Sequence, residues 1–180
     1  MQQGRKYLFK SERLGFRNWS VADIVPMAEI NADADVMEFF PGVQNMQQTE
    51  AFAKRMQKQM AEKGYCYFAA DKLETGEFIG FIGLSEQTFE ADFTPCIDIG
   101  WRLRKREWGK GLATEGARRC LSYAFNELDI GKINSMAPEI NLWSVHVMEK
   151  IGMKKVTDFL HPLLVDDERL SLCVLYEIVR

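Results

Sequence analysis

Two glycines, Gly109 and Gly111, are separated by one residue and stand directly before a long predicted helix. Glycine adopts positive φ and lets a ligand approach the backbone closely. The first amides of a helix have no internal partners and lie at the positive end of its dipole, so they bind phosphate oxygens. The segment therefore predicts an anion-binding site. A structural turn without a ligand is the alternative.

The common nucleotide motifs do not explain this loop. The spacing GxxxxGK[ST] is absent from it, and Gly109-Lys110-Gly111 lacks the third glycine of GxGxxG. The interval from the preceding strand to the glycines is also longer than the tight Rossmann turn. An unrelated phosphate binder stays open at this point.

Reactive side chains stand on the strand predicted over 95–103, where Asp98 and Arg102 share one face. Cys96 lies on the face of Asp98, but a nucleophilic cysteine needs a lowered pKa and a partner base. The two histidines, His146 and His161, lie in other motifs. We therefore expect no covalent cysteine intermediate. The four cysteines form no CxxC pair and no metal spacing, which is typical of reduced, buried thiols in a cytosolic protein.

The elements that must position these residues alternate between strand and helix patterns. Ser20 to Asp23 has the capping-box pattern, and Thr49 is a candidate cap for a second helix with apolar residues at every fourth position. Gly131 is the predicted end of the long helix. Strands are predicted over 14–16, 65–70, 78–84, 95–103, 132–137, 154–159 and 170–179, and helices over 20–31, from 49, over 111–128 and over 141–151. This order favours a mixed α/β sheet over a bundle or a sandwich.

Bulk properties exclude several classes of protein. The 180 residues carry a net charge of −3 and show no linker or repeat, which favours one domain over 11–180 after a short N-terminal extension over 1–10. The charge is far from that of a nucleic-acid-binding domain. No stretch approaches the roughly 18 apolar residues of a membrane helix, and no long apolar run follows the first residues. We expect a cytoplasmic protein that binds neither membranes nor nucleic acids.

The segment around the glycines resembles a known family. Arg106-x-x-Gly109-x-Gly111-x-Ala113 is similar to the signature by which GNAT acetyltransferases hold the pyrophosphate of acetyl-CoA. The wider pattern looks like the RimJ/RimL branch and covers about residues 11 to 180. It includes Ser11-Glu12-Arg13-Leu14, Thr75 to Gly80, Asn141-x-x-Ser144 and Lys150 to Met153. The resemblance implies a mixed, mostly antiparallel sheet of six to seven strands with a splayed central pair, flanked by four helices.

The resemblance implies acetyl-CoA as co-substrate, without a metal. The pantetheine arm would pair with the backbone around Trp101 and Leu103, as an added strand would. Asn141 is either a plain helix cap or a pantetheine contact. Arg106 and Lys110 would contact phosphate or be solvated surface cations. The pyrophosphate would rest on the amides of Gly109, Lys110, Gly111, Leu112, Ala113 and Thr114.

The resemblance also implies direct transfer to a primary amine. Asp98 stands where relatives carry an acidic residue and would accept the amine proton directly or through water, unless it is only a charged residue on an open strand face. Many relatives have a tyrosine as the general acid where this chain has Met148. Ser144 matches the serine of RimL-like members and would donate to the departing sulfur, or be an ordinary first-turn residue.

The acceptor is the least specified part. The resemblance implies a small-molecule amine or a protein N-terminus, walled by Phe39, Phe40, Phe81 and Glu86, and a homodimer is common in the family. A non-catalytic acyl-CoA sensor on the same fold is the alternative, kept open by Met148.

Overall fold

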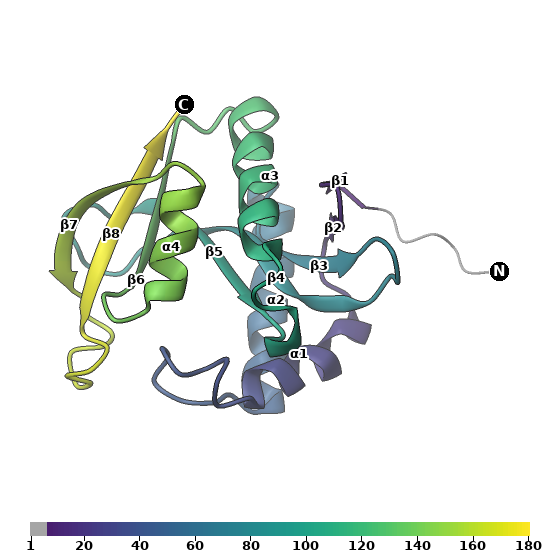
Figure 1. Ribbon diagram of the computed structural model, residues 1–180, viewed down its shortest axis with the longest axis horizontal. Helices are drawn as coiled ribbons and strands as arrows, with labels where there is room; N and C mark the ends of the chain where they lie inside the picture. The colour runs from purple at the N-terminus through teal and green to yellow at the C-terminus, as the bar shows by residue number, and fades with distance from the viewer. Residues whose placement is uncertain (1–6) are drawn as a thin grey trace.

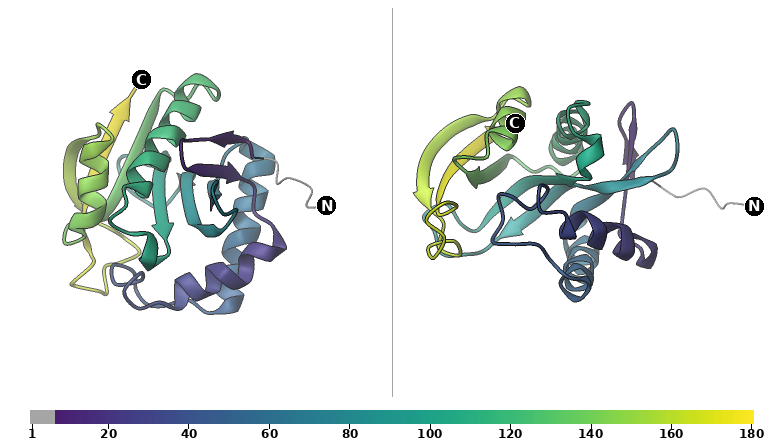
Figure 2. Two further views of the ribbon diagram at one scale, coloured as in Figure 1. Left: turned by 45° about the vertical axis from the view of Figure 1, so that its right-hand side comes forward. Right: turned by 60° about the horizontal axis from the view of Figure 1, so that its bottom comes forward.

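In the computed structural model, which describes residues 7–180, one mixed sheet carries two pairs of helices (Figure 1). The sheet has eight strands in the order β1-β2-β3-β4-β5-β6-β8-β7. The strands are β1 (Phe9–Lys10), β2 (Leu14–Arg17), β3 (Tyr67–Lys72), β4 (Phe78–Gln87), β5 (Cys96–Leu103), β6 (Lys132–Pro138), β7 (Lys154–Leu160) and β8 (Leu172–Val179). The helices α1 (Ile24–Ala32) and α2 (Met46–Lys63) lie on one face, and α3 (Leu112–Asn126) and α4 (Leu142–Lys150) on the other (Figure 2).

The predicted fold class is confirmed, with one more strand than expected. All neighbouring strands run antiparallel except β5 and β6. The additional strand is β1, in which Phe9 pairs with Phe16. It lies inside the predicted N-terminal extension, and Phe9 is buried in the core against Phe16 and Tyr123. A two-residue strand leaves no alternation of polar and apolar residues to recognise.

Two helix boundaries differ from the sequence prediction. The cap of α2 is Asn45, one turn before Thr49, and its side chain accepts from the amide of Gln48 at 2.9 Å. Thr49 is buried instead and donates its hydroxyl to the carbonyl of Asn45. The long helix α3 ends at Asn126, before Gly131. The predicted box at Ser20 is present, because the Ser20 amide donates to the carboxylate of Asp23 at 2.8 Å.

A buried ion network joins the first strands to α1. Arg17 makes two hydrogen bonds of 2.7 Å to Asp71 and bonds of 2.7 and 2.8 Å to Asp23. The Arg17 guanidinium holds the pKa of Asp23 below its usual range, against the effect of burial. Charged groups that pair so completely can be buried, since each donor finds an acceptor. The network fixes α1, and with it the loop that follows, on the sheet.

The middle of the sheet opens between its only parallel neighbours. β5 and β6 share a single pair of partners, Asp98 and Asn134, and separate beyond it (Figure 1). The hydroxyl of Ser135 on β6 donates to the carbonyl of Ile99 on β5 at 2.9 Å and connects the two strands next to this pair. The backbone of β5 from Gly100 to Leu103 therefore has a strand neighbour only on its β4 side. This is the splay that the resemblance implied.

Candidate active site

A cavity of about 620 Å³ lies at the opening of the sheet. Its walls come from three segments far apart in the sequence: the α1–α2 loop within 35–40, the end of β5 through the start of α3 within 101–114, and α4 within 141–150. Trp101, Leu103 and Ala113 are among the residues that line it. The cavity thus brings the predicted glycine loop together with the strand end and the aromatic loop.

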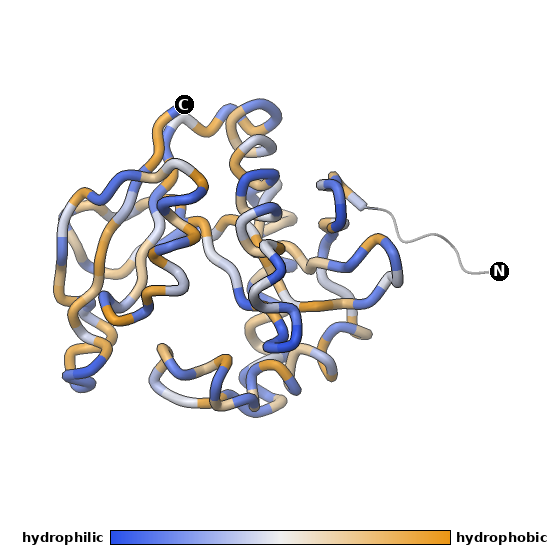
Figure 3. Tube along the Cα trace, viewed as in Figure 1, coloured by the Kyte–Doolittle hydropathy of each residue, from blue (hydrophilic) through white to orange (hydrophobic). Residues whose placement is uncertain are grey.

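The glycine loop has the backbone conformation that only glycine adopts easily. Gly109 has φ 72° and Gly111 has φ 76°, and both line the cavity. Gly111 is the N-cap of α3 and provides no side-chain cap for the first amides of that helix. The segment before it is strongly hydrophilic (Figure 3). Since Leu112, Ala113 and Thr114 also line the cavity, the first turn of α3 can receive an anion there.

An arginine that sequence reasoning left without a role holds this loop in place. The Arg13 Nε donates to Oε2 of Glu115 at 2.6 Å, and its Nη1 donates to the carbonyl of Lys110 at 3.0 Å. The amide of Arg13 and the hydroxyl of Ser11 both donate to the other oxygen of Glu115. The motif over 11–14 therefore ties β2 to the first turn of α3.

We expect Arg13→Ala to weaken acetyl-CoA binding modestly, because the loop loses a tether while its amides remain. Arg13 is about half exposed, so the KM for acetyl-CoA should rise by no more than about fivefold, with kcat little changed. Steady-state kinetics measure both. Arg119→Ala is the matched control, since Arg119 lies on α3 and pairs with Glu127 away from the loop. An unchanged KM in Arg13→Ala would contradict the tether.

Two predicted phosphate contacts are engaged elsewhere. Arg106 forms an ion pair with Glu77, and Lys110 reaches Glu107 at 3.0 Å. Neither side chain lines the cavity. Glu107 is buried, and its basic neighbours hold its pKa below the usual range although burial opposes this. The structure therefore places the backbone amides, and not these two cations, at the wall of the cavity.

The carboxylate of Asp98 is buried beside a tyrosine. Tyr67 donates its hydroxyl to Oδ2 of Asp98 at 2.5 Å, and its ring covers Gly100. Oδ1 is buried without a hydrogen-bond partner among residues 7–180. Burial raises the pKa of Asp98 to about 7, while the Tyr67 hydrogen bond acts in the opposite direction. A carboxylate with this pKa exchanges its proton near neutral pH, as a general base must. Asp98 does not itself line the cavity.

The start of α4 contributes polar atoms to the opposite wall. Asn141 caps the helix, because its Oδ1 accepts from the amide of Ser144 at 3.2 Å. Both residues line the cavity, and the hydroxyl of Ser144 has no hydrogen-bond partner within the described part of the chain. Trp143 lies between them and is 72% exposed. The wall therefore presents one free hydroxyl and one open indole.

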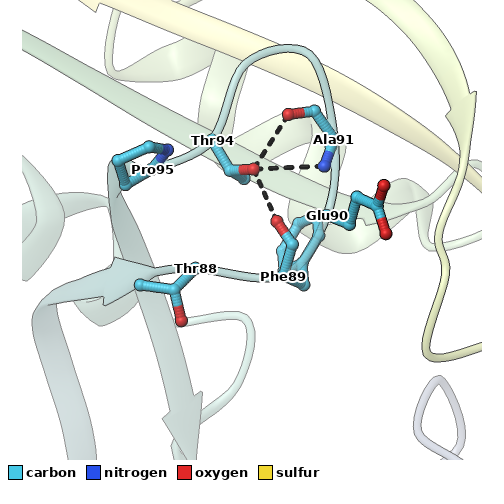
Figure 4. Close-up of a pocket in the computed structure, with 6 residues that line it drawn as sticks. All are labelled: Thr88, Phe89, Glu90, Ala91, Thr94 and Pro95. Carbon is cyan, nitrogen blue, oxygen red and sulfur yellow. Dashed lines mark hydrogen bonds between the residues drawn. The ribbon is translucent and has the colours of Figure 1, made fainter.

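A second hollow lies in the β4–β5 loop and offers less chemistry. It is lined by Thr88, Phe89, Glu90, Ala91, Thr94 and Pro95 (Figure 4). The Thr94 hydroxyl is bonded to the carbonyls of Phe89 and Ala91 and to the Ala91 amide (Figure 4). The Thr94 hydroxyl is thus engaged within the turn. We therefore assign the chemistry to the cavity at the sheet opening.

Comparison with known proteins agrees with this geometry. Residues 13–154, well over half of the chain, match the family model described as an acetyltransferase (GNAT) domain. This chain belongs to the GNAT acetyltransferase family. It is 40% identical over 124 residues to the uncharacterised protein YkkB of Bacillus subtilis, covering 67% of this chain and 69% of that protein. It is 28% identical to the uncharacterised N-acetyltransferase YnaD of the same organism, covering 81% of each chain.

A solved structure shows the same fold. The crystal structure of a GNAT-family acetyltransferase from Bacillus anthracis superposes with a TM-score of 0.79 at 27% identity, covering 94% of this chain and 96% of that one. This GNAT protein is accordingly an enzyme that uses acetyl-CoA for N-acetylation. The cavity fits that co-substrate, because uncapped helix amides stand at one end and an unpaired strand edge runs along it.

The usual acid position of this GNAT enzyme holds no proton donor. Met148 is 1% exposed and lies in the core. Ser144, four residues earlier, lies one helical turn away on α4 and lines the cavity. Ser144 thus places a hydroxyl at the cavity, whereas Met148 does not.

The four predicted acceptor residues separate into two groups in this GNAT fold. Phe39 and Phe40 line the cavity as expected. Phe81 lies behind them, buried and stacked on Tyr67 at 5.1 Å. Glu86 pairs with Lys63 at 3.6 Å and does not line the cavity. Glu86 lies near the C-terminal end of β4, opposite Ile97, and not beside Phe39 and Phe40.

The cysteines of this GNAT enzyme lack the setting of nucleophiles. Burial raises the pKa of the Cys96 thiol to about 11, and Cys66, Cys120 and Cys173 are buried. No group of three or more His, Cys, Asp or Glu side chains among residues 7–180 is arranged to hold a metal ion. Over the same residues, no helix combines the length and apolar character required to cross a bilayer.

Proposed function

We propose that this enzyme transfers the acetyl group of acetyl-CoA directly to a primary amine, either of a small molecule or of a protein N-terminus. The observation that carries the proposal is the single cavity. It joins the uncapped start of α3 to the Phe39–Phe40 loop across the opening between β5 and β6. Donor and acceptor would meet in this cavity, near the strand that carries Asp98, without a covalent intermediate on the protein.

The co-substrate would be held mostly by backbone groups. The amides from Gly109 to Thr114 would receive its diphosphate, and the open edge of β5 at Trp101 and Leu103 would pair with the pantetheine arm. Asn141 would add a polar contact from α4. Acetyl-CoA supplies the acetyl group as a thioester, and coenzyme A leaves as the thiol.

Proton transfer would be divided between two side chains. Asp98 would take the proton of the attacking amine through a water molecule, since its carboxylate lies behind the wall of the cavity. Ser144 would hydrogen-bond the departing sulfur from the opposite side. An amide near Trp101 would polarise the thioester carbonyl. The roles require an ionised Asp98, so the rate should rise as pH increases through about 7.

Three finer assignments belong to this proposal. The motifs over 11–14, 75–80 and 150–153 favour the RimJ/RimL-like branch of the family. We also propose a cytoplasmic location and a homodimer on the same resemblance. The sensor alternative receives no support from the geometry, because the cavity extends past the glycine loop to an acceptor side.

Product identification tests the proposal. Purified protein is incubated with acetyl-CoA and a panel of amino acids, polyamines and short peptides. Thiol release is followed by absorbance, and acetylated products by mass spectrometry. We expect acetylation of amines with stoichiometric release of coenzyme A, and none in reactions without protein. Tight binding of acetyl-CoA with no transfer to any amine would contradict the function and favour the sensor.

A further inference from the structure

Arg102 lines the cavity and, like Lys150 on α4, has no carboxylate partner among residues 7–180. Arg102 lines the cavity from the face of β5 that also carries Asp98. Its Nη1 donates to Oδ1 of Asn31 at 2.8 Å, and its Nε is buried without an acceptor among the described residues. No carboxylate within residues 7–180 pairs with it. By contrast, Arg17, which is buried against the sheet, pairs with two carboxylates.

The guanidinium is held firmly in this position. The Arg102 Cζ lies 4.1 Å from the ring centroid of Phe40 and 5.5 Å from that of Phe81. Its partner Asn31 is fully buried and donates to the hydroxyl of Thr49 at 3.0 Å. Desolvation lowers the pKa of Arg102 to about 10, so the group is still charged at neutral pH. A preorganised, desolvated cation without a counter-charge is costly unless a ligand supplies one.

The Arg102 N–H groups that have no acceptor indicate the chemistry of the ligand. Asn31 uses Nη1, Nε is buried, and neither Nε nor Nη2 has an acceptor among residues 7–180. The N–H groups of Nη2 can therefore donate to a carboxylate. Of the acidic side chains that line the cavity, Asp35 pairs with Lys105 and Glu107 with Lys110, while Glu38 is exposed. The positive charge of Arg102 should repel a polycationic amine.

From this arrangement we propose that the acceptor carries a carboxylate as well as its amine, as an amino acid or a short peptide with a free C-terminus does, and that Arg102 binds that carboxylate. The inference rests on the proposed function and names the substrate class of the same site. Arg102 lies on the same face of β5 as Asp98, four residues further along the strand.

Matched acceptors test the proposal. Each set contains a carboxylic acid, its primary amide and the amine without either group, built on aromatic and aliphatic amino acids and on dipeptides. Spermidine represents the polycations. With the wild-type enzyme, we expect kcat/KM for the acid to exceed that for its amide by about 30-fold. In Arg102→Gln this advantage should disappear, with the amide rate changed less than about threefold and the KM for acetyl-CoA unchanged.

Arg104→Gln is the control variant, because Arg104 follows the same strand, pairs with Glu29 at 3.1 Å and does not line the cavity. It should keep the preference for the acid. If Arg102→Gln does not fold, the comparison of acid and amide acceptors with the wild-type enzyme still tests the proposal. Equal use of acids and amides, a preference for spermidine, or an acid preference that survives in Arg102→Gln would overturn the proposal while the transferase function stands. Transfer to no amine at all would overturn both.

Discussion

Replacement of Gly111 by aspartate is expected to weaken acetyl-CoA binding at least about 100-fold while the protein remains folded. Two like charges about 4 Å apart repel by roughly 4 kcal/mol at the effective dielectric of a protein surface. The new carboxylate would lie at the uncapped start of α3 and occupy the amides that receive the diphosphate. Space does not oppose the change, since a Cβ at Gly111 meets only Nη2 of Arg13, at 3.7 Å, although φ 76° is strained for any residue with a side chain.

Two variants separate charge from backbone strain. Gly111→Asn has the same size and the same positive φ without the charge, so it should bind acetyl-CoA far better than Gly111→Asp. Gly76→Asp places the same residue at φ 69° in open space in the β3–β4 turn, where binding should not change. Calorimetry measures the affinities, and circular dichroism checks the fold. Wild-type affinity in folded Gly111→Asp would remove the glycine loop from the binding site.

Asp98→Asn should lower kcat by about 1000-fold, within the range of a lost general base. The amide cannot accept the proton of the amine, while its shape preserves the packing under Tyr67. The affinity for acetyl-CoA should stay within about twofold, because Asp98 does not line the cavity. The wild-type rate should also rise with pH through about 7, and this rise should be absent from the variant. Equal pH–rate profiles would exclude Asp98 as the base.

The same variant has a stability signature that does not depend on activity. The pKa of Asp98 in the folded protein, about 7, lies above the 3.8 of a free aspartate, so the native state retains the proton where the unfolded state has lost it. The contribution of Asp98 to stability should therefore fall as pH increases from about 4 to about 7. Asp98→Asn should match wild type at pH 4 and exceed it at pH 8 by on the order of 4 kcal/mol. Denaturant unfolding at both pH values measures the difference, and a gain that is equal at both would contradict the raised pKa.

Local patterns predicted most of the fold. The alternation over 95–103 and the apolar stripe from Ala113 to Leu128 correspond to β5 and α3. The errors lie where a residue distant in the sequence determines the local structure. Thr49 has the chemistry of a helix cap, but its hydroxyl is engaged by Asn31 from α1, and Asn45 caps α2 instead. A sequence does not show which of two competent caps a tertiary contact will take.

The glycine loop and its helix start were more predictable from the sequence than the setting of Asp98. A glycine before a helix predicts an anion site, because the glycine and the first amides of the helix are adjacent in the chain. The setting of Asp98 depends on Tyr67, which is 31 residues away and reaches it through the pairing of β3 with β4. The shared face of Asp98 and Arg102 was visible in the sequence. The lack of a carboxylate beside Arg102 was not, since it depends on which loops close over the strand.

The opening between β5 and β6 gives the bound co-substrate a mechanical role. Strands β1 to β5 and strands β6 to β8 form two panels, joined along the sheet by one pair of residues and the bond from Ser135 to Ile99. A ligand that lies along the free edge of β5 bridges the seam between the panels. Saturation with acetyl-CoA should therefore stiffen the whole sheet, and the energy of binding is shared between holding the donor and holding the two panels in register.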